Sequence, residues 1–503
     1  MRTRLGRWLV LSVAAALVTG ALAQSTVRIG LAEDPDILDP ALARTYVGRI
    51  VFASLCDKLF DIDTSAGVIP QLATGYSTSA DGLTVTIDIR SGVLFHDGTP
   101  LDAEAVKYNL DRAVNLPGSN RASELAQLES VTVVDEDTVE LHLSTPFSPL
   151  IAQLADRAGM MVSPTAAEAA GENFGNAPVC AGPFTFVERV SQDRIVLERF
   201  ADYYRADEVL IDRVVFLPIP DSSVRLANLQ SGDLQMIERP APTDLGIMRQ
   251  DANLVIPSTP SLGYQGITIN LSKGGPRTDP MATDARVREA FELALDRNVI
   301  NDVVFGGEYV VGNQPVPPSS PWYVADIPIA QRDVERARAL LDEAGVDRVS
   351  FEMMVANSPE GVRTGEVIQA LVSEAGFDIT LRATEFATAL DLQEQGQYFA
   401  FPVGWSGRID PDGNIHAFHT CEGSLNESGF CDPQVDELLN AARAAGTFDE
   451  RFDLYKQALE RYLPDRHIIY LYHTQLFFPH TTDLEGFQAY PDGLIRLLGV
   501  SLN

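Results

Sequence analysis

The length of the chain is the feature that most constrains its fold. A single hydrophobic core stops growing at roughly 250–300 residues, whereas this chain has 503 residues, of which 45% are hydrophobic. We therefore expect at least two lobes, each with its own core. Beyond the first residues, no apolar run approaches the ~18 residues that a membrane-spanning helix needs, so we expect no span in the mature protein.

The charge balance is strongly acidic. Lys and Arg together number 38 against 70 Asp and Glu, which gives a formal net charge of −32. A surface of this sign repels a phosphate backbone, so we expect no nucleic-acid partner.

The N-terminus has the pattern of a secretory signal peptide. Three arginines lie within the first seven residues, an apolar stretch follows at 8–18, and Ala21-Leu22-Ala23 supplies small residues before a cleavage point. We predict cleavage before Gln24, which makes 1–23 a signal peptide. An N-terminal anchor helix is the alternative.

Four cysteines behind such a leader suggest disulfide bonds, because exported proteins meet an oxidising compartment. Three pairings are open among Cys56, Cys180, Cys421 and Cys431. We favour Cys421–Cys431, since this bond would close a short loop rich in Gly, Ser and Asn, and therefore Cys56–Cys180. Free buried thiols are the alternative.

Strand and helix patterns alternate along much of the chain, which predicts an α/β fold. An apolar strand at 27–31 precedes an amphipathic helix at 47–60. A further strand–helix unit covers 211–231, and Gly232 suits a left-handed C-cap.

Familiar catalytic motifs such as GxxxxGK[ST], HExxH and GxSxG are missing from the sequence. We therefore expect a protein that is not an enzyme, with a secreted hydrolase as the rival class. His416 and His419 could ligate a metal with Cys421 and Cys431, but a disulfide competes for the same sulfurs. The segment 410–414 resembles part of a calcium loop, yet its twelfth position is a cysteine rather than glutamate. We expect neither a metal nor a cofactor.

Several segments resemble those of one protein family, in that family's order. They are Leu38-Asp39-Pro40 and Gly67–Ala73 near the start, Phe95–Val106 (FHDGTPLDAEAV), Cys180–Phe184 with its Gly-Pro-Phe, and Asp284–Ala290. In these segments the chain is similar to the solute-binding proteins of peptide-type ABC importers, the family 5 extracellular solute-binding proteins. That family includes dipeptide-, oligopeptide-, glutathione- and nickel-binding members.

The resemblance implies an α/β fold with two lobes joined by a hinge, the class II periplasmic binding protein of the large peptide-binding type. It implies lobe one at 24–262, lobe two at 263–478 and a C-terminal return to lobe one at 479–503. An extra subdomain of lobe one would cover 46–179. A Cys56–Cys180 bond would then hold the two ends of that insertion together.

The activity that the resemblance implies is binding without turnover. A peptide or similar small polar solute would enter between the lobes, and its contacts with both would favour the closed state. The implied partners are this solute and the permease subunits of an ABC importer in the inner membrane, and we expect a periplasmic monomer. A metal-chelate (nickel-type) or sugar binder of the same fold is the alternative.

The cleft residues that we expect from lobe two follow the strand at 399–403, because ligands bind beyond the C-terminal ends of strands in open α/β sheets. Trp405 offers a flat apolar face, and Ser406 follows it. Arg408 offers a fork for a carboxylate or phosphate, and Asp410 could hold an ammonium or hydroxyl group. The alternative is a structural loop in which Trp405 fills the core and Arg408 pairs with Asp410.

This loop departs from the pattern of peptide-binding relatives, in which an acidic residue shortly after the Trp holds the peptide amino terminus. Arg408 stands at or beside that place, so either Asp410 takes over the role or the ligand presents an anion. Dipeptide-binding relatives also carry an Arg before the next helix. The matching stretch 355–358 offers Asn357 instead, which puts a simple dipeptide ligand in doubt.

The remaining ligand-binding candidates belong to lobe one or to the crossover. They are Tyr46, Glu238, Arg239 and Tyr264.

Overall fold

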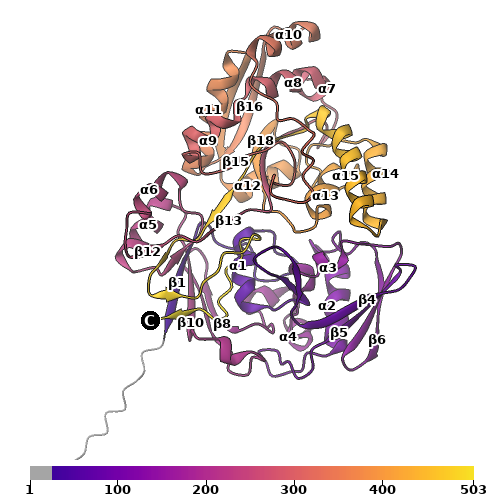
Figure 1. Cartoon of the computed structure of the whole chain (residues 1–503), viewed down its shortest axis with the longest axis vertical. Helices are drawn as coiled ribbons and strands as arrows, with labels where there is room; N and C mark the ends of the chain where they lie inside the picture. The colour runs from indigo at the N-terminus through magenta and orange to yellow at the C-terminus, as the bar shows by residue number, and fades with distance from the viewer. Residues whose placement is uncertain (1–24) are drawn as a thin grey trace, which may run out of the picture.

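The computed structural model describes residues 25–503 and shows two lobes, one above the other in Figure 1. The signal-peptide prediction and its cleavage point before Gln24 lie outside the described residues. Among the residues described, no helix is long and apolar enough to cross a membrane.

The lower lobe, called lobe one below, is built on a seven-stranded sheet. Its strands, in spatial order, are β12 (Leu254–Val255), β21 (His480–Thr481), β11 (Met236–Ile237), β1 (Thr26–Leu31), β10 (Arg213–Pro218), β9 (Arg194–Arg199) and β8 (Phe184–Val190). β1 pairs in parallel with β10 and β11, and the other pairs are antiparallel. Helices α5 (Ser222–Ser231) and α6 (Leu245–Met248) lie at the β12 end of this sheet (Figure 1).

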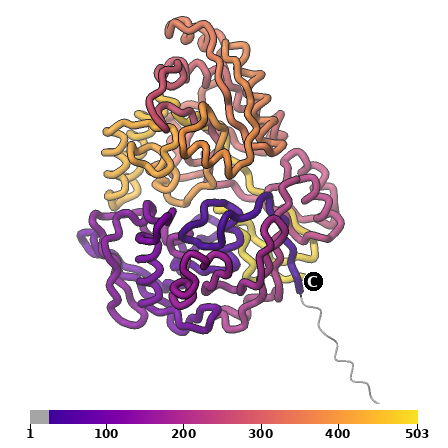
Figure 2. The backbone as a smooth tube through the Cα atoms, turned by 180° about the vertical axis from the view of Figure 1, so that it is seen from behind, coloured from indigo at the N-terminus to yellow at the C-terminus, as the bar shows by residue number. Residues whose placement is uncertain are grey.

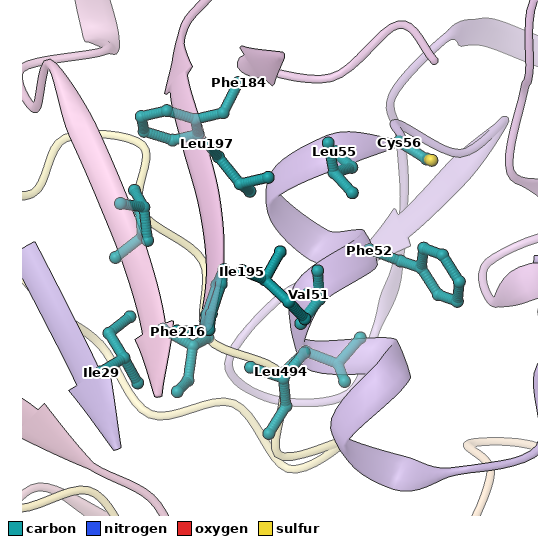
Figure 3. Close-up of a cluster of buried hydrophobic side chains, with 14 of the residues drawn as sticks. Ile29, Val51, Phe52, Leu55, Cys56, Phe184, Ile195, Leu197, Phe216 and Leu494 are labelled. Carbon is teal, nitrogen blue, oxygen red and sulfur yellow. The ribbon is translucent and has the colours of Figure 1, made fainter. Parts of the chain in front are cut away.

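Helix α1 (Tyr46–Leu55) packs its apolar face on the seven-stranded sheet, as Figure 3 shows. Residues of α1, the strands and the C-terminal tail meet in this core: Ile29, Val51, Leu55, Phe184, Leu197, Phe216 and Leu494. The helix ends at Leu55 rather than near residue 60. Cys56 has an extended backbone, and the Gly182 N–H donates to the Leu55 carbonyl at 2.9 Å, which occupies an acceptor that a longer helix would need.

A second part of lobe one is an antiparallel four-stranded sheet with its own core. Its strands are β4 (Ala73–Thr78), β5 (Thr84–Ile89), β7 (Thr138–Leu143) and β6 (Leu128–Asp135), with β2 (Phe60–Ile62) and β3 (Val68–Pro70) as a nearby hairpin. Helices α2 (Ala103–Asn115) and α3 (Leu150–Gln153) pack on this core, whereas α4 (Pro164–Ala170) buries Ala167 in the core of the seven-stranded sheet. The Asp102 carboxylate caps α2 by accepting from the Ala105 N–H at 2.9 Å.

The upper lobe, called lobe two below, is built on a six-stranded mixed sheet. Its strands, in order, are β15 (Val310–Val311), β19 (Ile468–His473), β14 (Tyr264–Ile269), β18 (Ala400–Trp405), β16 (Val349–Ala356) and β17 (Phe377–Thr384). Its helices are α7 (Pro280–Thr283), α8 (Ala285–Ala294), α9 (Arg297–Phe305), α10 (Val334–Ala344), α11 (Pro359–Ser373), α12 (Phe386–Glu394), α13 (Asp412–His419), α14 (Pro433–Ala444) and α15 (Phe448–Tyr462).

The two lobes are joined by an antiparallel pair of short strands, β13 (Ser258–Pro260) and β20 (Gln475–Phe477). After β20 the chain returns to lobe one, where β21 lies between β12 and β11 in the sheet. Figure 2 shows this yellow C-terminal segment running among the indigo and magenta segments of lobe one.

Both favoured disulfide pairings are confirmed. Cys56 is bonded to Cys180 and Cys421 to Cys431, with sequence separations of 124 and 10 residues.

Candidate functional site

Trp405 is the last residue of β18, and the loop that follows it contacts lobe one through Ser406 and Arg408. Its indole N–H donates to the side-chain oxygen of Asn414 at 3.0 Å, and the same oxygen accepts from the Arg408 backbone N–H at 2.7 Å. The Asn414 amide returns a bond to the Arg408 carbonyl at 3.0 Å. Asn414, near the start of α13, therefore holds both the Trp405 side chain and the Arg408 backbone in place.

Two glycines let this loop pass close to the crossover between the lobes. Gly407 has φ +82°, and a Cβ there would lie 2.2 Å from the Leu262 carbonyl carbon. A Cβ on Gly263 would lie 1.9 Å from the Trp405 carbonyl oxygen. Side chains at either position would push the loop away from the crossover.

Arg408 reaches from this loop into lobe one. Its Nε lies 2.8 Å from a carboxylate oxygen of Asp156, and its guanidinium carbon is 4.4 Å from the centre of the Trp405 ring. Asp156 also binds Arg49 of α1, whose Nε donates to it at 3.1 Å, and Arg49 donates to the Ser406 hydroxyl at 3.3 Å. We call these five residues the junction, because they join the two lobes: Arg49, Asp156, Trp405, Ser406 and Arg408.

The charged groups of the junction are buried, and they shift one another's pKa values. Burial lowers the pKa of Arg408 to about 10, although the Asp156 charge opposes this shift. Burial alone would raise the pKa of Asp156, but the charges of Arg49 and Arg408 hold it well below its ordinary value. Asp156 is therefore ionised at neutral pH and takes part in two ion pairs.

The two aspartates that follow Arg408 pair within lobe two. The Asp410 carboxylate accepts hydrogen bonds from both Nη atoms of Arg451, at 2.7 and 2.8 Å. Asp412 binds Arg443 in the same way at 2.7 and 2.9 Å. Arg408 therefore does not pair with Asp410, and the carboxylates of the suggested calcium loop are already neutralised by arginines.

A second group of candidate residues lies on lobe one, beside the junction: Tyr46, Glu238 and Arg239. The Arg239 guanidinium carbon lies 4.8 Å from the centre of the Tyr46 ring, and its Nε lies 3.4 Å from Glu238. Glu238 is buried and accepts from the Ala32 N–H at 2.6 Å, whereas the Arg239 side chain remains 45% exposed. Since Tyr46 and Arg49 lie one turn apart on α1, this group adjoins the junction.

Two other expected residues occupy different surroundings. Tyr264 is buried, with its ring 4.7 Å from that of Tyr470, and stands opposite Trp405 in the β14–β18 register. It supports the Trp405 strand from within the core. Asn357 is exposed just before α11 and is not part of the junction.

The residues suggested as soft-metal ligands are bound to one another or to other side chains. The sulfurs of Cys421 and Cys431 form a disulfide. The two ring nitrogens of His419 lie 2.7 Å from His467 and 2.8 Å from the Tyr470 hydroxyl. Four ligands thus cannot converge there in this structure.

Arg49 and Asp156 were missed by sequence reasoning, although a signal was present. Arg49 interrupts the apolar stretch 47–52, and Asp156-Arg157 interrupts the mostly apolar stretch 154–162. A charged residue inside an apolar stretch is buried only if it is paired, so these positions were candidates for an internal ion pair.

The junction borders a cavity of about 20 Å³, which has room for roughly one water molecule. It is lined by residues of both lobes, including Arg49, Asp156 and Arg408. In this closed arrangement the lobes therefore meet almost directly at the junction.

Comparison of the sequence with known proteins shows which family the chain is similar to. A family model described as bacterial extracellular solute-binding proteins, family 5, middle, matches residues 67–426. The glutathione-binding protein of Pectobacterium atrosepticum is 30% identical over 508 residues, which cover 97% of this chain and 96% of the relative. The dipeptide-binding protein of Escherichia coli is 30% identical over 476 residues, 88% of each chain.

A solved structure shares the architecture. The ABC transporter-associated periplasmic binding protein of Helicobacter pylori, in complex with the peptide STSA, matches with a TM-score of 0.88 and 21% identity, over 95% of this chain and 98% of that one. This likeness confirms the two-lobed α/β fold that the resemblance implied. The chain belongs to family 5 of the bacterial extracellular solute-binding proteins.

Proposed function

We propose that this chain is the periplasmic solute-binding component of an ABC importer and that it captures a peptide-like solute between its lobes without altering it. The observation that carries the proposal is the junction, where Trp405, Ser406 and Arg408 of lobe two meet Arg49 and Asp156 of lobe one. Relatives named for binding glutathione and dipeptides support a small polar solute. Delivery to permease subunits in the inner membrane would follow, with the protein acting as a monomer.

The sheet memberships support the expected division of the chain into lobes. Lobe one would span 24–262, with the extra subdomain at 46–179, because the four-stranded sheet falls inside that insertion. Lobe two would span 263–478, since its sheet begins with β14 and ends with β19. The return at 479–503 contains β21, which pairs in the first sheet.

Solute binding would work by stabilising the closed state. A solute that contacts both lobes favours closure by its difference in affinity for the closed and open forms. We assign direct contact to the face of Trp405, the Ser406 hydroxyl and the free guanidinium edge of Arg408, with Tyr46 and Arg239 on the opposite wall. Asp410, Glu238 and Tyr264 would support these groups, since each is already engaged or buried.

The test is to identify a solute and to show that it closes the lobes. Purified protein is denatured, released small molecules are identified by mass spectrometry, and dipeptides, tripeptides and glutathione are titrated by calorimetry. We expect one-to-one binding, a smaller radius of gyration in X-ray scattering when the solute is bound, and recovery of the solute unchanged. Sustained product release, or scattering that no released or added solute alters, would contradict the proposal.

Two aromatic substitutions test whether Trp405 contacts the solute. Trp405→Ala should weaken binding about tenfold, which corresponds to about 1.4 kcal/mol, because the flat apolar face is lost. Phe448→Ala removes an exposed aromatic ring at the start of α15 and should leave the affinity unchanged. Equal effects of the two substitutions would remove Trp405 from the site.

A further inference from the structure

A short turn joins the four-stranded part of lobe one to lobe two. This turn, residues 146–149, follows β7 and leads into α3, and its Phe147 is buried in the core of the four-stranded sheet. Figure 1 places α3 beneath α13 and α14 of lobe two. The turn is therefore anchored in lobe one by Phe147, and its next residue, Ser148, bonds to lobe two.

Ser148 binds the C-terminal end of α14. Its backbone N–H donates to the Arg443 carbonyl at 2.9 Å, and its hydroxyl donates to the Ala445 carbonyl at 2.5 Å. The last carbonyls of a helix have no partner within the helix. Ala445 is extended, so α14 does not end in the left-handed turn that would satisfy some of them. Closure of the lobes thus gives these carbonyls protein donors, and separation returns them to water.

The same end of α14 is connected to the Trp405 loop. The Arg443 guanidinium carbon lies 5.4 Å from the centre of the Phe147 ring, and its nitrogens bind the buried Asp412 at 2.7 and 2.9 Å. Asp412 is the first residue of α13, two residues before Asn414, which holds the Trp405 side chain. A contact that lobe one makes at α14 can therefore act on the loop through the Arg443–Asp412 pair.

Two further contacts join the same parts of the molecule. The Ile409 side chain, in the Trp405 loop, packs against the core of the four-stranded sheet. Ser424, inside the loop that the Cys421–Cys431 disulfide closes, donates from its hydroxyl to that of Ser123 at 3.3 Å. Together with the Ser148 turn, these contacts involve the segments before α13, between α13 and α14, and after α14.

We propose that the Ser148 turn and the end of α14 form a closure clasp, in which docking of the four-stranded part of lobe one on α14 fixes the Trp405 loop through Arg443 and Asp412. The inference rests on the proposed solute-binding function and gives the four-stranded part of lobe one a role in it. Arg443 is a positioning residue, since it acts on the loop through Asp412. Opening the lobes breaks the clasp and removes one support of the loop, which couples solute release to opening.

The first experiment needs no solute. Deuterium exchange, measured by mass spectrometry of peptides from the full-length mature protein, reports how often protected amides open to solvent. Ser148→Ala removes the hydroxyl donor and keeps the backbone N–H. We expect exchange in segments 144–150 and 443–447 to become about three- to tenfold faster, as the loss of one net hydrogen bond predicts. The second segment belongs to the other lobe, which a local effect of the substitution does not reach.

Ser144→Ala is the matched control for this substitution. Ser144 belongs to the same segment, and its hydroxyl donates within lobe one, to the Gln127 carbonyl at 3.4 Å. This variant should leave exchange in segment 443–447 unchanged. Equal exchange in Ser148→Ala and the unsubstituted protein would overturn the clasp.

The second experiment tests the positioning role of Arg443. Arg443→Gln is combined with Asp412→Asn, so that no buried charge loses its partner. Trp322→Phe in the background leaves Trp405 as the one tryptophan after residue 24. We expect Trp405 emission to shift to longer wavelength, because the loop loses a support and its indole meets more water. The exchange experiment decides the proposal even where this variant does not fold.

A second neutralised ion pair is the control for the fluorescence. Arg348→Gln with Asp378→Asn removes an exposed pair of lobe two and should leave Trp405 emission unchanged. If neutralising the Arg443–Asp412 pair left the emission unshifted as well, the link from α14 to the loop would be wrong.

The clasp and the solute-binding function fail in different ways. A solute that closes the lobes, and that Ser148→Ala binds as tightly as the unsubstituted protein with equal amide exchange, would overturn the clasp and leave the solute-binding function standing. Faster exchange in both lobes of that variant, without closure by any of the dipeptides, tripeptides or glutathione titrated, would support the clasp and count against the solute-binding function.

Discussion

At the scale of single residues, burial keeps one motif histidine neutral. The His96 ring accepts a hydrogen bond from the Cys180 N–H at Nδ1, at 3.3 Å, and donates from Nε2 to the Gly182 carbonyl, at 3.0 Å. Burial lowers the pKa of His96 to about 4. A second proton would remove the Nδ1 acceptor, so the folded protein resists it.

This histidine predicts a loss of stability in acid. Between pH 6.5 and about 4 the unfolded chain binds a proton at His96 that the folded chain does not, so its contribution is complete above pH 6.5 and declines as pH falls. The expected slope is up to about 1.4 kcal/mol per pH unit. His96→Gln should reduce the drop in unfolding free energy between pH 7 and 5 by up to about 2 kcal/mol, measured by urea denaturation.

The matched control is His142→Gln, because His142 of β7 is partly exposed and its side chain reaches solvent. This variant should keep the pH slope of the unsubstituted protein. If His96→Gln kept that slope too, another group would be responsible for the acid sensitivity.

Residue identities were easier to predict than residue partners. The Trp405 loop was predicted to line the cleft, and Arg408 was expected to offer its fork to a carboxylate or phosphate of the ligand, with pairing to Asp410 as the alternative. The structure pairs Arg408 with Asp156, which is far away in sequence and belongs to the other lobe. Such a contact depends on how two lobes dock, and no local pattern of spacing or propensity encodes that.

At the scale of elements, local chemistry made several predictions reliable. Gly232 was expected to cap a helix, and it ends α5 in the left-handed conformation with φ 81°. The disulfides followed from loop length and compartment. The end of α1 could not be predicted from local sequence. It depends on the Gly182 N–H, which a distant segment brings to the end of the helix.

The two disulfides should contribute unequally to stability. In the chain-entropy account a bond that closes a longer loop restricts the unfolded chain more, so separations of 124 and 10 residues predict about 5 and about 2.7 kcal/mol. Cys56→Ala with Cys180→Ala should therefore lower the unfolding free energy more than Cys421→Ala with Cys431→Ala. Chemical denaturation of both double variants measures this, and the reverse order would contradict it.

At the scale of the whole molecule, ionic contacts at the outer edge favour the closed form. Arg44 of lobe one lies 3.4 Å from Asp391 and 3.7 Å from Glu394, both on α12 of lobe two. Figure 1 places α1 and α3 of the lower lobe beneath α12 and α13. These side chains are about half exposed, so each pair contributes modestly and is screened by salt.

Reversing this charge should open the molecule. Arg44→Glu places like charges at the edge and is expected to enlarge the radius of gyration of the solute-free protein at low salt and to weaken solute binding several-fold. Both effects should shrink at 0.5 M salt. X-ray scattering and calorimetry measure them.

A second substitution serves as the control for the first. Adding Asp391→Arg to Arg44→Glu restores an opposite pair and should recover compactness and affinity. If the single reversal changed neither quantity at low salt, these contacts would not contribute to closure.

The position of β21 within the first sheet has a consequence for folding. Lobe one cannot complete its sheet until β21 (His480–Thr481), which follows the whole of lobe two in the chain, has inserted between β12 and β11. Because a pairing between segments so distant in sequence forms only after a long loop has closed, we expect this sheet to be completed late in folding.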